Sequence, residues 1–175
     1  PYYMTDRVIE AVAGIPAVCE SLHLPVQSGS DDLLKKMLRN YTRDQYLRLV
    51  EKLRAAMPGI TISTDLIVGF PGETESDFKQ TLSLIQEAEF DWGFIFKYSA
   101  REGTPAAEWE SFPESLIEER HQECLELLDQ KGLEKRQSLL GARQEVLIED
   151  DNQGRTRSNH KVKVEGDVAP GELVH

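Results

Sequence analysis

A carboxylate inside an apolar run is the feature of this chain that points most directly to chemistry. Asp65 lies near the end of the hydrophobic run Ile60–Val68, which stops at Gly-Phe-Pro-Gly, residues 69–72. An unpaired carboxylate in a buried strand is costly or takes up a proton. Ligands of parallel sheets bind at the carboxyl ends of the strands. We therefore expect Asp65 to have a partner, either a bound ligand or a structural hydrogen-bond donor.

Three loops that combine small and hydrogen-bonding residues follow three predicted strands. Their sequences are Gln-Ser-Gly-Ser at 27–30, Gly-Phe-Pro-Gly-Glu at 69–73 and Ser-Ala-Arg-Glu-Gly-Thr at 99–104. Small residues let the backbone approach a ligand closely. Each loop by itself is ordinary turn chemistry, but three loops on one edge of a parallel sheet predict a shared pocket. The loop at 69–73 lacks the spacing of a phosphate-binding loop.

Two charged or titratable side chains allow two interpretations each. Arg39 precedes a predicted helix start at Thr42 and would be able to hold a carboxylate with two hydrogen bonds. From the residues alone, a solvated surface arginine is slightly favoured. His23 lies within a predicted strand and is interpreted as a buried core residue rather than a catalyst. The four histidines show no metal-ligand spacing.

The cysteines and two aromatic residues favour structural interpretations. Cys19 and Cys124 are far apart in sequence, so they predict neither a disulfide framework nor a metal site, and both are expected to be small core residues. Trp109 and Phe112 are expected to cover apolar surface. An aromatic side chain near Arg101 would also be suited to stack on a nucleobase.

Composition limits the classes of function. The 175 residues are 39% hydrophobic and carry a formal net charge of −11, which argues against non-specific nucleic-acid binding by the whole surface. The window 153–164 nevertheless holds four basic residues and no acid, which is compatible with a local basic patch. No apolar run is long enough to span a bilayer and no signal peptide is visible, which favours a cytoplasmic protein without a membrane partner.

Alternating strand and helix patterns predict an α/β fold with parallel strands and right-handed crossovers. At the start of the helix at 42–57, Thr42 and Gln45 form a capping-box pattern. Three or four such units make half a barrel or a small open sheet. Strands are predicted at 22–26, 60–68 and 92–98, and helices at 5–13, at 42–57, at 74–88 and after Pro113.

The pattern changes after Gly141. Residues 145–149 and 161–165 predict strands, and 151–154 form a turn cluster. We therefore divide the chain into an α/β part, residues 1–137, and a small, incomplete β-domain, residues 138–175.

Four motifs in order resemble one known family. They lie at 23–30, 37–42, 64–74 and 98–107, and together they are similar to the radical S-adenosylmethionine methylthiotransferases. The match is best to the branch that methylthiolates isopentenylated adenosine beside the tRNA anticodon. Residues 146–149 and 154–159 resemble the RNA-binding TRAM domain of that family. The resemblance implies the C-terminal half of a radical SAM barrel, a partial TIM-like barrel, followed by part of a TRAM-like domain.

The resemblance also implies roles for individual residues. Gln27 and Asp65 would bind the ribose of S-adenosylmethionine, and Arg39 its methionyl carboxylate. The backbone around Ile67, Gly69 and Phe70 would line the adenine. The residues implied on the substrate side are Tyr98, Ser99 and Arg101, and those implied to bind tRNA phosphates are Arg155, Arg157, Lys161 and Lys163.

Enzymes of this family carry [4Fe–4S] clusters held by closely spaced cysteines, which this chain lacks. The chain alone is therefore expected to be inactive, while the full-length enzyme would require an electron donor and tRNA. Exposed sheet edges of a half barrel are expected to favour oligomerisation. The alternatives are the sister branch acting on threonylcarbamoyladenosine and a non-catalytic RNA-binding module; the branch that modifies a ribosomal protein fits less well.

Overall fold

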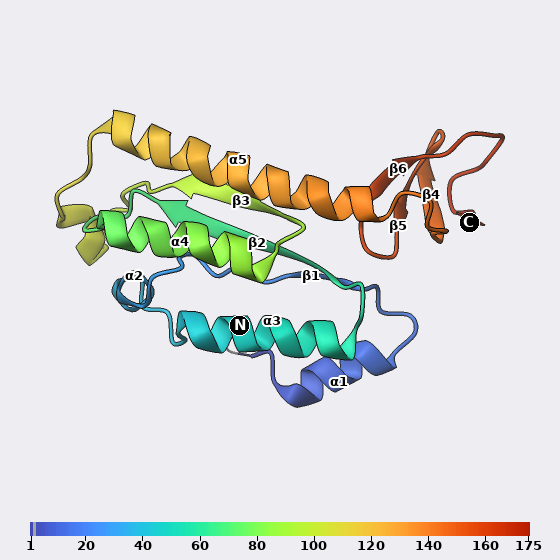
Figure 1. Cartoon of the computed structure of the whole chain (residues 1–175), viewed down its shortest axis with the longest axis horizontal. Helices are drawn as coiled ribbons and strands as arrows, with labels where there is room; N and C mark the ends of the chain where they lie inside the picture. Colours follow the sequence, from blue (N-terminus) through green and yellow to red (C-terminus); the bar gives the residue numbers. More distant parts are fainter. Residues whose placement is uncertain (2) are drawn as a thin grey trace.

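A parallel three-stranded sheet with helices on one face forms the larger part of the molecule (Figure 1). The computed structural model describes residues 1 and 3–175. The strands are β1 (Ser21–His23), β2 (Thr61–Val68) and β3 (Trp92–Lys97), in the order β1-β2-β3. The long connections carry α3 (Arg43–Ala56) and α4 (Glu75–Ala88), and α5 (Glu114–Ser138) follows β3. The predicted α/β class with parallel strands is confirmed.

In its second half, β2 alternates between a covered and an open face. Leu66 and Val68 are fully buried in the core beneath the helices, together with Ile62. Asp65 and Ile67 lie on the other face and are only partly buried. Their register partners on β3 are two phenylalanines that are 59% and 50% exposed, Phe94 and Phe96. Among the described residues, no helix packs over Phe94 and Phe96, which lie beside Asp65 and Ile67 on this face.

Side-chain caps define where the helices begin. The Thr42 hydroxyl accepts a hydrogen bond from the Gln45 N–H, and the Thr42 N–H donates to the Gln45 side-chain oxygen, so the predicted capping box is confirmed. Thr74 and Asp77 form a second capping box at α4. Pro113 is the N-cap residue of α5. The shorter helical elements include α1 (Asp6–Gly14) and the 3-10 helix η1 (Pro105–Glu108).

The sequence analysis is corrected at two places near the first strand. The predicted strand at 22–26 is paired only over Ser21–His23, because Pro25 has no N–H to donate, and pairing resumes at the isolated bridge between Gln27 and Leu66. Between the predicted strand at 22–26 and the predicted helix at 42–57 lies a short helix that the sequence analysis did not predict, α2 (Asp31–Lys36). The Ser30 hydroxyl accepts from the N–H of Leu33 and caps this helix.

The C-terminal part forms a small antiparallel sheet. Its strands are β4 (Val146–Asp150), β5 (Gln153–Thr156), β6 (Lys161–Lys163) and β7 (Leu173–Val174), in the order β6-β5-β4-β7. The predicted turn cluster at 151–154 is too long, because β5 already begins at Gln153 and Asn152 makes the tight turn at φ 52°. Val146 and Ile148 form the buried side of this sheet. Its separation as a domain at residue 138 stays a prediction.

The small sheet packs against the amino ends of the parallel strands. The Thr61 hydroxyl at the start of β2 donates to the Ser158 carbonyl at 2.8 Å. The Trp92 ring at the start of β3 contacts the His160 ring edge-on, with centroids 6.1 Å apart. The loops 27–30, 69–73 and 99–104 lie at the opposite, carboxyl ends, which we call the loop edge (Figure 1). In the described part of the chain, no helix has the length and hydropathy to cross a membrane.

Candidate functional site

Gln27 is the first residue of the loop 27–30 and has a strained backbone conformation. Its φ is 75°, a left-handed value that a residue with a side chain seldom adopts and that concentrates at functional sites. Two backbone hydrogen bonds hold it there: its N–H donates to the Asp65 carbonyl at 2.8 Å, and its carbonyl accepts from Ile67 at 2.9 Å. The strain is therefore supported by β2, the strand that carries Asp65.

The loop after Gln27 is fixed to the start of α4. The Gly29 N–H donates to the Thr81 hydroxyl at 3.1 Å, and the Ser30 hydroxyl donates to Asp77 at 2.5 Å. A Cβ added at Gly29 would lie 2.3 Å from the Gln80 carbonyl oxygen, so only glycine allows this approach. The contact explains why a glycine stands in this loop without any reference to a ligand.

Arg39 reaches Gln27 from the end of α2. Its Nη2 donates to Gln27 Oε1 at 3.3 Å. The chain turns out of α2 at Leu38, whose φ is 56°, and the Arg39 N–H closes the turn on the Leu34 carbonyl. The short helix that sequence reasoning missed is thus the element that positions the predicted carboxylate-binding arginine. The structure brings Gln27 and Arg39 together.

Asp65 carries a buried oxygen without a hydrogen-bond partner among the described residues. Its Oδ1 is inaccessible and accepts no hydrogen bond, although His23 Nε2 lies 3.4 Å away. His23 Nδ1 shares a hydrogen bond with the Ser63 hydroxyl at 2.9 Å. The interpretation of His23 as a core residue is wrong, because its side chain is 45% exposed on the open face of the sheet. A carboxylate in this setting has capacity for a further donor.

The loop 69–73 turns sharply at two glycines and is held by a buried ion pair. Gly69 and Gly72 have φ values of 72° and 78°. Glu73 is fully buried, and its Oε2 accepts from the Gly69 N–H at 3.0 Å and from Arg120 Nη1 at 2.7 Å. Burial raises the pKa of the Glu73 carboxyl above its ordinary value. The loop that follows β2 is therefore anchored to α5.

Arg120 completes this anchor, and sequence reasoning missed it. Its side chain is only 6% exposed, and its guanidinium lies over the rings of Phe78 and Phe112 at 5.1 and 5.4 Å. The Nη2 atom also lies 3.4 Å from Glu75. The available signal was a single arginine in the otherwise acidic segment 108–126. We name these contacts of Glu73 and Arg120 the loop anchor.

Aromatic rings continue from the loop anchor toward the predicted substrate side. The Phe70 ring meets Tyr98 edge-on at 5.1 Å and Trp109 at 6.0 Å. The Tyr98 hydroxyl is buried and has no hydrogen-bond partner among the described residues. Ser99 and Arg101 are exposed beyond it. The predicted substrate-side residues thus follow β3 at the loop edge, next to Phe70.

The four predicted RNA-binding residues have different surroundings. Lys161 and Lys163 are exposed on the outer strand β6, and Lys161 is the register partner of Arg155. Arg155 itself contacts Glu149 at 3.0 Å and Asn159 at 2.7 Å. These three residues lie on the small sheet, far from the loop edge.

Arg157 instead joins the two sheets. Its guanidinium donates to both carboxylate oxygens of Glu20 at 2.9 and 3.0 Å, and to the carbonyls of Pro16 and Val18 at 2.8 Å. The hydrogen bond from Arg157 lowers the pKa of the Glu20 carboxyl. The donors of Arg157 are therefore engaged within the chain, and phosphate binding by this residue would require them to be released.

The described part of the chain contains no set of side chains that could hold a metal cluster. Groups of three or more candidate ligand side chains do not occur there. Cys124 is buried, and burial raises the pKa of its thiol to about 12. The expectation that both cysteines are core residues is wrong for Cys19, which is exposed.

The comparisons with known proteins agree on one class. Residues 1–85 match the Radical SAM superfamily. The whole chain is 47% identical to tRNA-2-methylthio-N(6)-dimethylallyladenosine synthase 1 of Mycobacterium marinum and to the synthase of that name from Clostridium botulinum, covering 33% and 41% of those proteins. The chain thus spans well under half the length of these curated relatives. Among solved structures, archaeal Elp3 from Methanocaldococcus infernus aligns with a TM-score of 0.55 at 21% identity, over 72% of this chain and 30% of that one, which supports the fold alone.

Proposed function

We propose that the chain belongs to the radical SAM superfamily, whose model matches residues 1–85, and that it is part of a tRNA methylthiotransferase. The full-length enzyme would use S-adenosylmethionine and [4Fe–4S] clusters to add a methylthio group to position 2 of isopentenylated adenosine next to the anticodon. The support is similarity along the entire chain to synthases named for the methylthio-dimethylallyladenosine product.

The hydrogen bond between Arg39 and Gln27 is the observation that carries the cofactor part of the proposal. It joins two of the three proposed S-adenosylmethionine ligands, while backbone bonds join Gln27 to Asp65, the third. Arg39 would hold the methionyl carboxylate, since a guanidinium pairs with carboxylates bidentately. The ribose hydroxyls would donate to the Asp65 carboxylate, whose side chain is 23% exposed. Ile67, Gly69 and Phe70 would line the adenine.

The residues present do not fit an iron–sulfur cluster. Cys19 and Cys124 cannot provide the several closely spaced thiolates that such clusters need. We propose that the cluster ligands belong to the part of the enzyme outside this chain, because the curated relatives are more than twice as long. We assign no catalytic role to any residue of the chain.

tRNA would be bound at two places. Tyr98, Ser99 and Arg101 would lie beside the adenosine at the loop edge. Lys161 and Lys163, whose ammonium groups make no ion pair within the described residues, would bind phosphates from the small sheet.

Substitution of the proposed cofactor ligands tests this function. In the full-length enzyme, Asp65→Ala and Arg39→Ala should each lower S-adenosylmethionine affinity and the yield of methylthiolated tRNA nucleoside by tenfold or more. Arg48→Ala is the matched control, since Arg48 pairs with Asp44 on the exposed side of α3. Calorimetry measures affinity, and mass spectrometry of digested tRNA identifies the product. Full activity in both variants would refute the cofactor assignment, and a threonylcarbamoyl product would assign the enzyme to the sister branch.

A further inference from the structure

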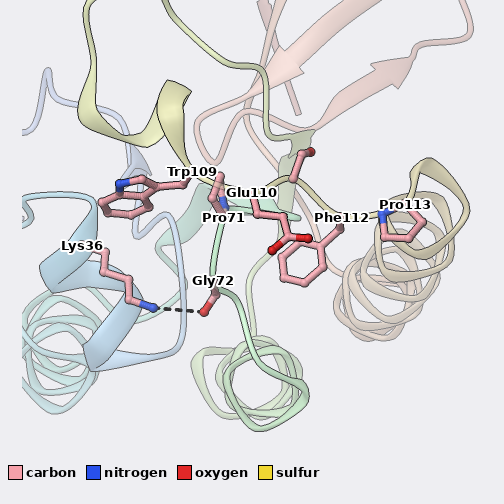
Figure 2. Close-up of a pocket in the computed structure, with 8 residues that line it drawn as sticks. Lys36, Pro71, Gly72, Trp109, Glu110, Phe112 and Pro113 are labelled. Carbon is pink, nitrogen blue, oxygen red and sulfur yellow. Dashed lines mark hydrogen bonds between the residues drawn. The ribbon is translucent and has the colours of Figure 1, made fainter.

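A pocket beside the loop edge has no role in the proposed cofactor site. Its volume is about 590 Å³, within the range of small-molecule sites. Figure 2 shows that it lies between α2, the loop 69–73 and the segment leading into α5. The residues that matter for its chemistry are Lys36, Gly72, Trp109, Glu110 and Phe112.

Trp109 offers an aromatic surface that is both fixed and accessible. The Trp109 and Phe70 rings meet in a T-shaped arrangement with an interplanar angle of 90°. Trp109 is nevertheless 42% exposed. Phe112 differs, because it is packed against the core and lies under the Arg120 guanidinium. Of the two aromatic residues that the sequence singled out, Trp109 is therefore the more exposed one.

A cationic and an anionic side chain line the pocket together with the Trp109 indole. The Lys36 ammonium is exposed and is held at the pocket wall by a 3.0 Å hydrogen bond to the Gly72 carbonyl (Figure 2). The Glu110 carboxylate also lines the pocket, and among the described residues it forms neither a hydrogen bond nor an ion pair. An ammonium attracts phosphate, whereas a carboxylate repels it and accepts hydrogen bonds from base amino groups.

We propose that this pocket binds an unpaired nucleobase of the RNA substrate, stacked on Trp109, with its phosphate toward Lys36. The proposal rests on the proposed function, because it places a neighbour of the modified adenosine. Bases with an exocyclic amino group, adenine and cytosine above all, fit the Glu110 carboxylate better than uracil does. Phe70 contacts Trp109 and belongs to the proposed adenine-lining loop, so the stacked base would lie next to the cofactor.

Tryptophan fluorescence tests the proposal directly, because the chain has only two tryptophans, Trp92 and Trp109. In the Trp92→Phe variant, Trp109 is the sole reporter. Titration at low salt with an unlabelled RNA stem–loop whose unpaired bases are adenines should quench the emission of Trp109. A loop of uracils should quench less, and Glu110→Gln should reduce this preference.

Affinity gives the second measurement. Stacking of one base is worth about 1–3 kcal/mol, so Trp109→Ala should weaken RNA binding about 5- to 150-fold in fluorescence anisotropy with labelled RNA. Trp92→Phe is the matched control and should bind as the unchanged chain does. Lys161→Ala should weaken binding without altering the quench of Trp109.

The outcomes separate this inference from the proposed function. RNA binding with unchanged Trp109 emission and no loss in Trp109→Ala would overturn the stacking pocket and leave the tRNA function standing. Failure of the full-length enzyme to bind any RNA at low salt would count against both.

Discussion

The buried pair of Glu73 and Arg120 should make the stability of an Arg120→Met variant depend strongly on pH. Methionine keeps the length and packing of the arginine stem but removes the charge and its donors. Glu73 then keeps a single hydrogen bond to its carboxylate, from the Gly69 N–H at 3.0 Å. An uncompensated carboxylate that is fully buried will take up a proton.

The free energy needed to protonate Glu73 at pH 7 sets the size of the destabilisation in Arg120→Met. A carboxyl group with an ordinary pKa of 4.5 must be protonated at pH 7, which costs about 3.4 kcal/mol at about 1.36 kcal/mol per pKa unit. This agrees with the roughly 3–5 kcal/mol measured when one partner of a buried pair is removed. The loss is a large fraction of a typical unfolding free energy of about 5–15 kcal/mol.

The direction of the pH dependence follows from the same proton. A buried carboxyl whose pKa is raised on folding holds its proton more tightly in the folded state, so stability falls as pH rises from the unfolded pKa to the folded pKa. In the unchanged chain, the free energy of unfolding stops falling with pH once Glu73 ionises beside Arg120. In Arg120→Met the fall should continue through pH 7, by up to about 1.4 kcal/mol per pH unit. Urea unfolding followed by circular dichroism at pH 5, 6, 7 and 8 measures it.

A double variant provides the control. Glu73→Gln together with Arg120→Met removes both charges, so it should be more stable at pH 7 than Arg120→Met alone and should lose the extra pH dependence. Arg48→Met controls for the loss of an arginine from an exposed helix face. If the double variant is no more stable than the single one, and both show the pH profile of the unchanged chain, the two residues are not coupled as argued.

Three further outcomes are expected. Gly29→Ala should destabilise the chain by about 1–3 kcal/mol in urea unfolding, because the added Cβ would lie 2.3 Å from backbone. Gly14→Ala is the control, since its Cβ would enter open space and the substitution should be neutral. Equal effects of the two substitutions would contradict the packing argument. Arg157→Met should loosen the small sheet from the parallel sheet, seen as a larger radius of gyration in small-angle X-ray scattering, and an unchanged radius would show that other contacts suffice. Cys19 should react quickly with a thiol reagent in the folded chain while Cys124, whose pKa is raised to about 12, should react only on unfolding; two fast thiols would contradict the burial.

Local patterns explain why much of the fold was predictable from the sequence. The Thr42–Gln45 capping box needs only four adjacent residues, and both partners form the predicted bonds. The apolar run before Gly69 became β2 because its alternate residues pack beneath the helices. The resemblance to a known family, rather than any spacing, suggested that Gln27 and Arg39 share a ligand. Their direct hydrogen bond is consistent with that prediction, whose ligand stays untested.

The features that sequence reasoning missed depend on pairs distant in the chain. Arg157 lies 137 residues from Glu20, and Arg120 lies 47 residues from Glu73. A charged residue gives no sign in the sequence of whether its partner is solvent, phosphate or a carboxylate brought close by folding. His23 was misjudged for a related reason: a strand position indicates a face of the sheet, but whether that face is covered depends on elements elsewhere.

Helix α5 links the two proposed RNA-binding regions into one rigid unit. Its 25 residues span about 37 Å at 1.5 Å per residue. Arg120 anchors the loop 69–73 near its start, and the small sheet with Lys161 follows its end (Figure 1). Because Arg157 fastens that sheet to the chain before β1, the distance between the basic strand and the loop edge is fixed from both sides. An RNA that occupies both regions must therefore present its phosphates and its unpaired base at that separation.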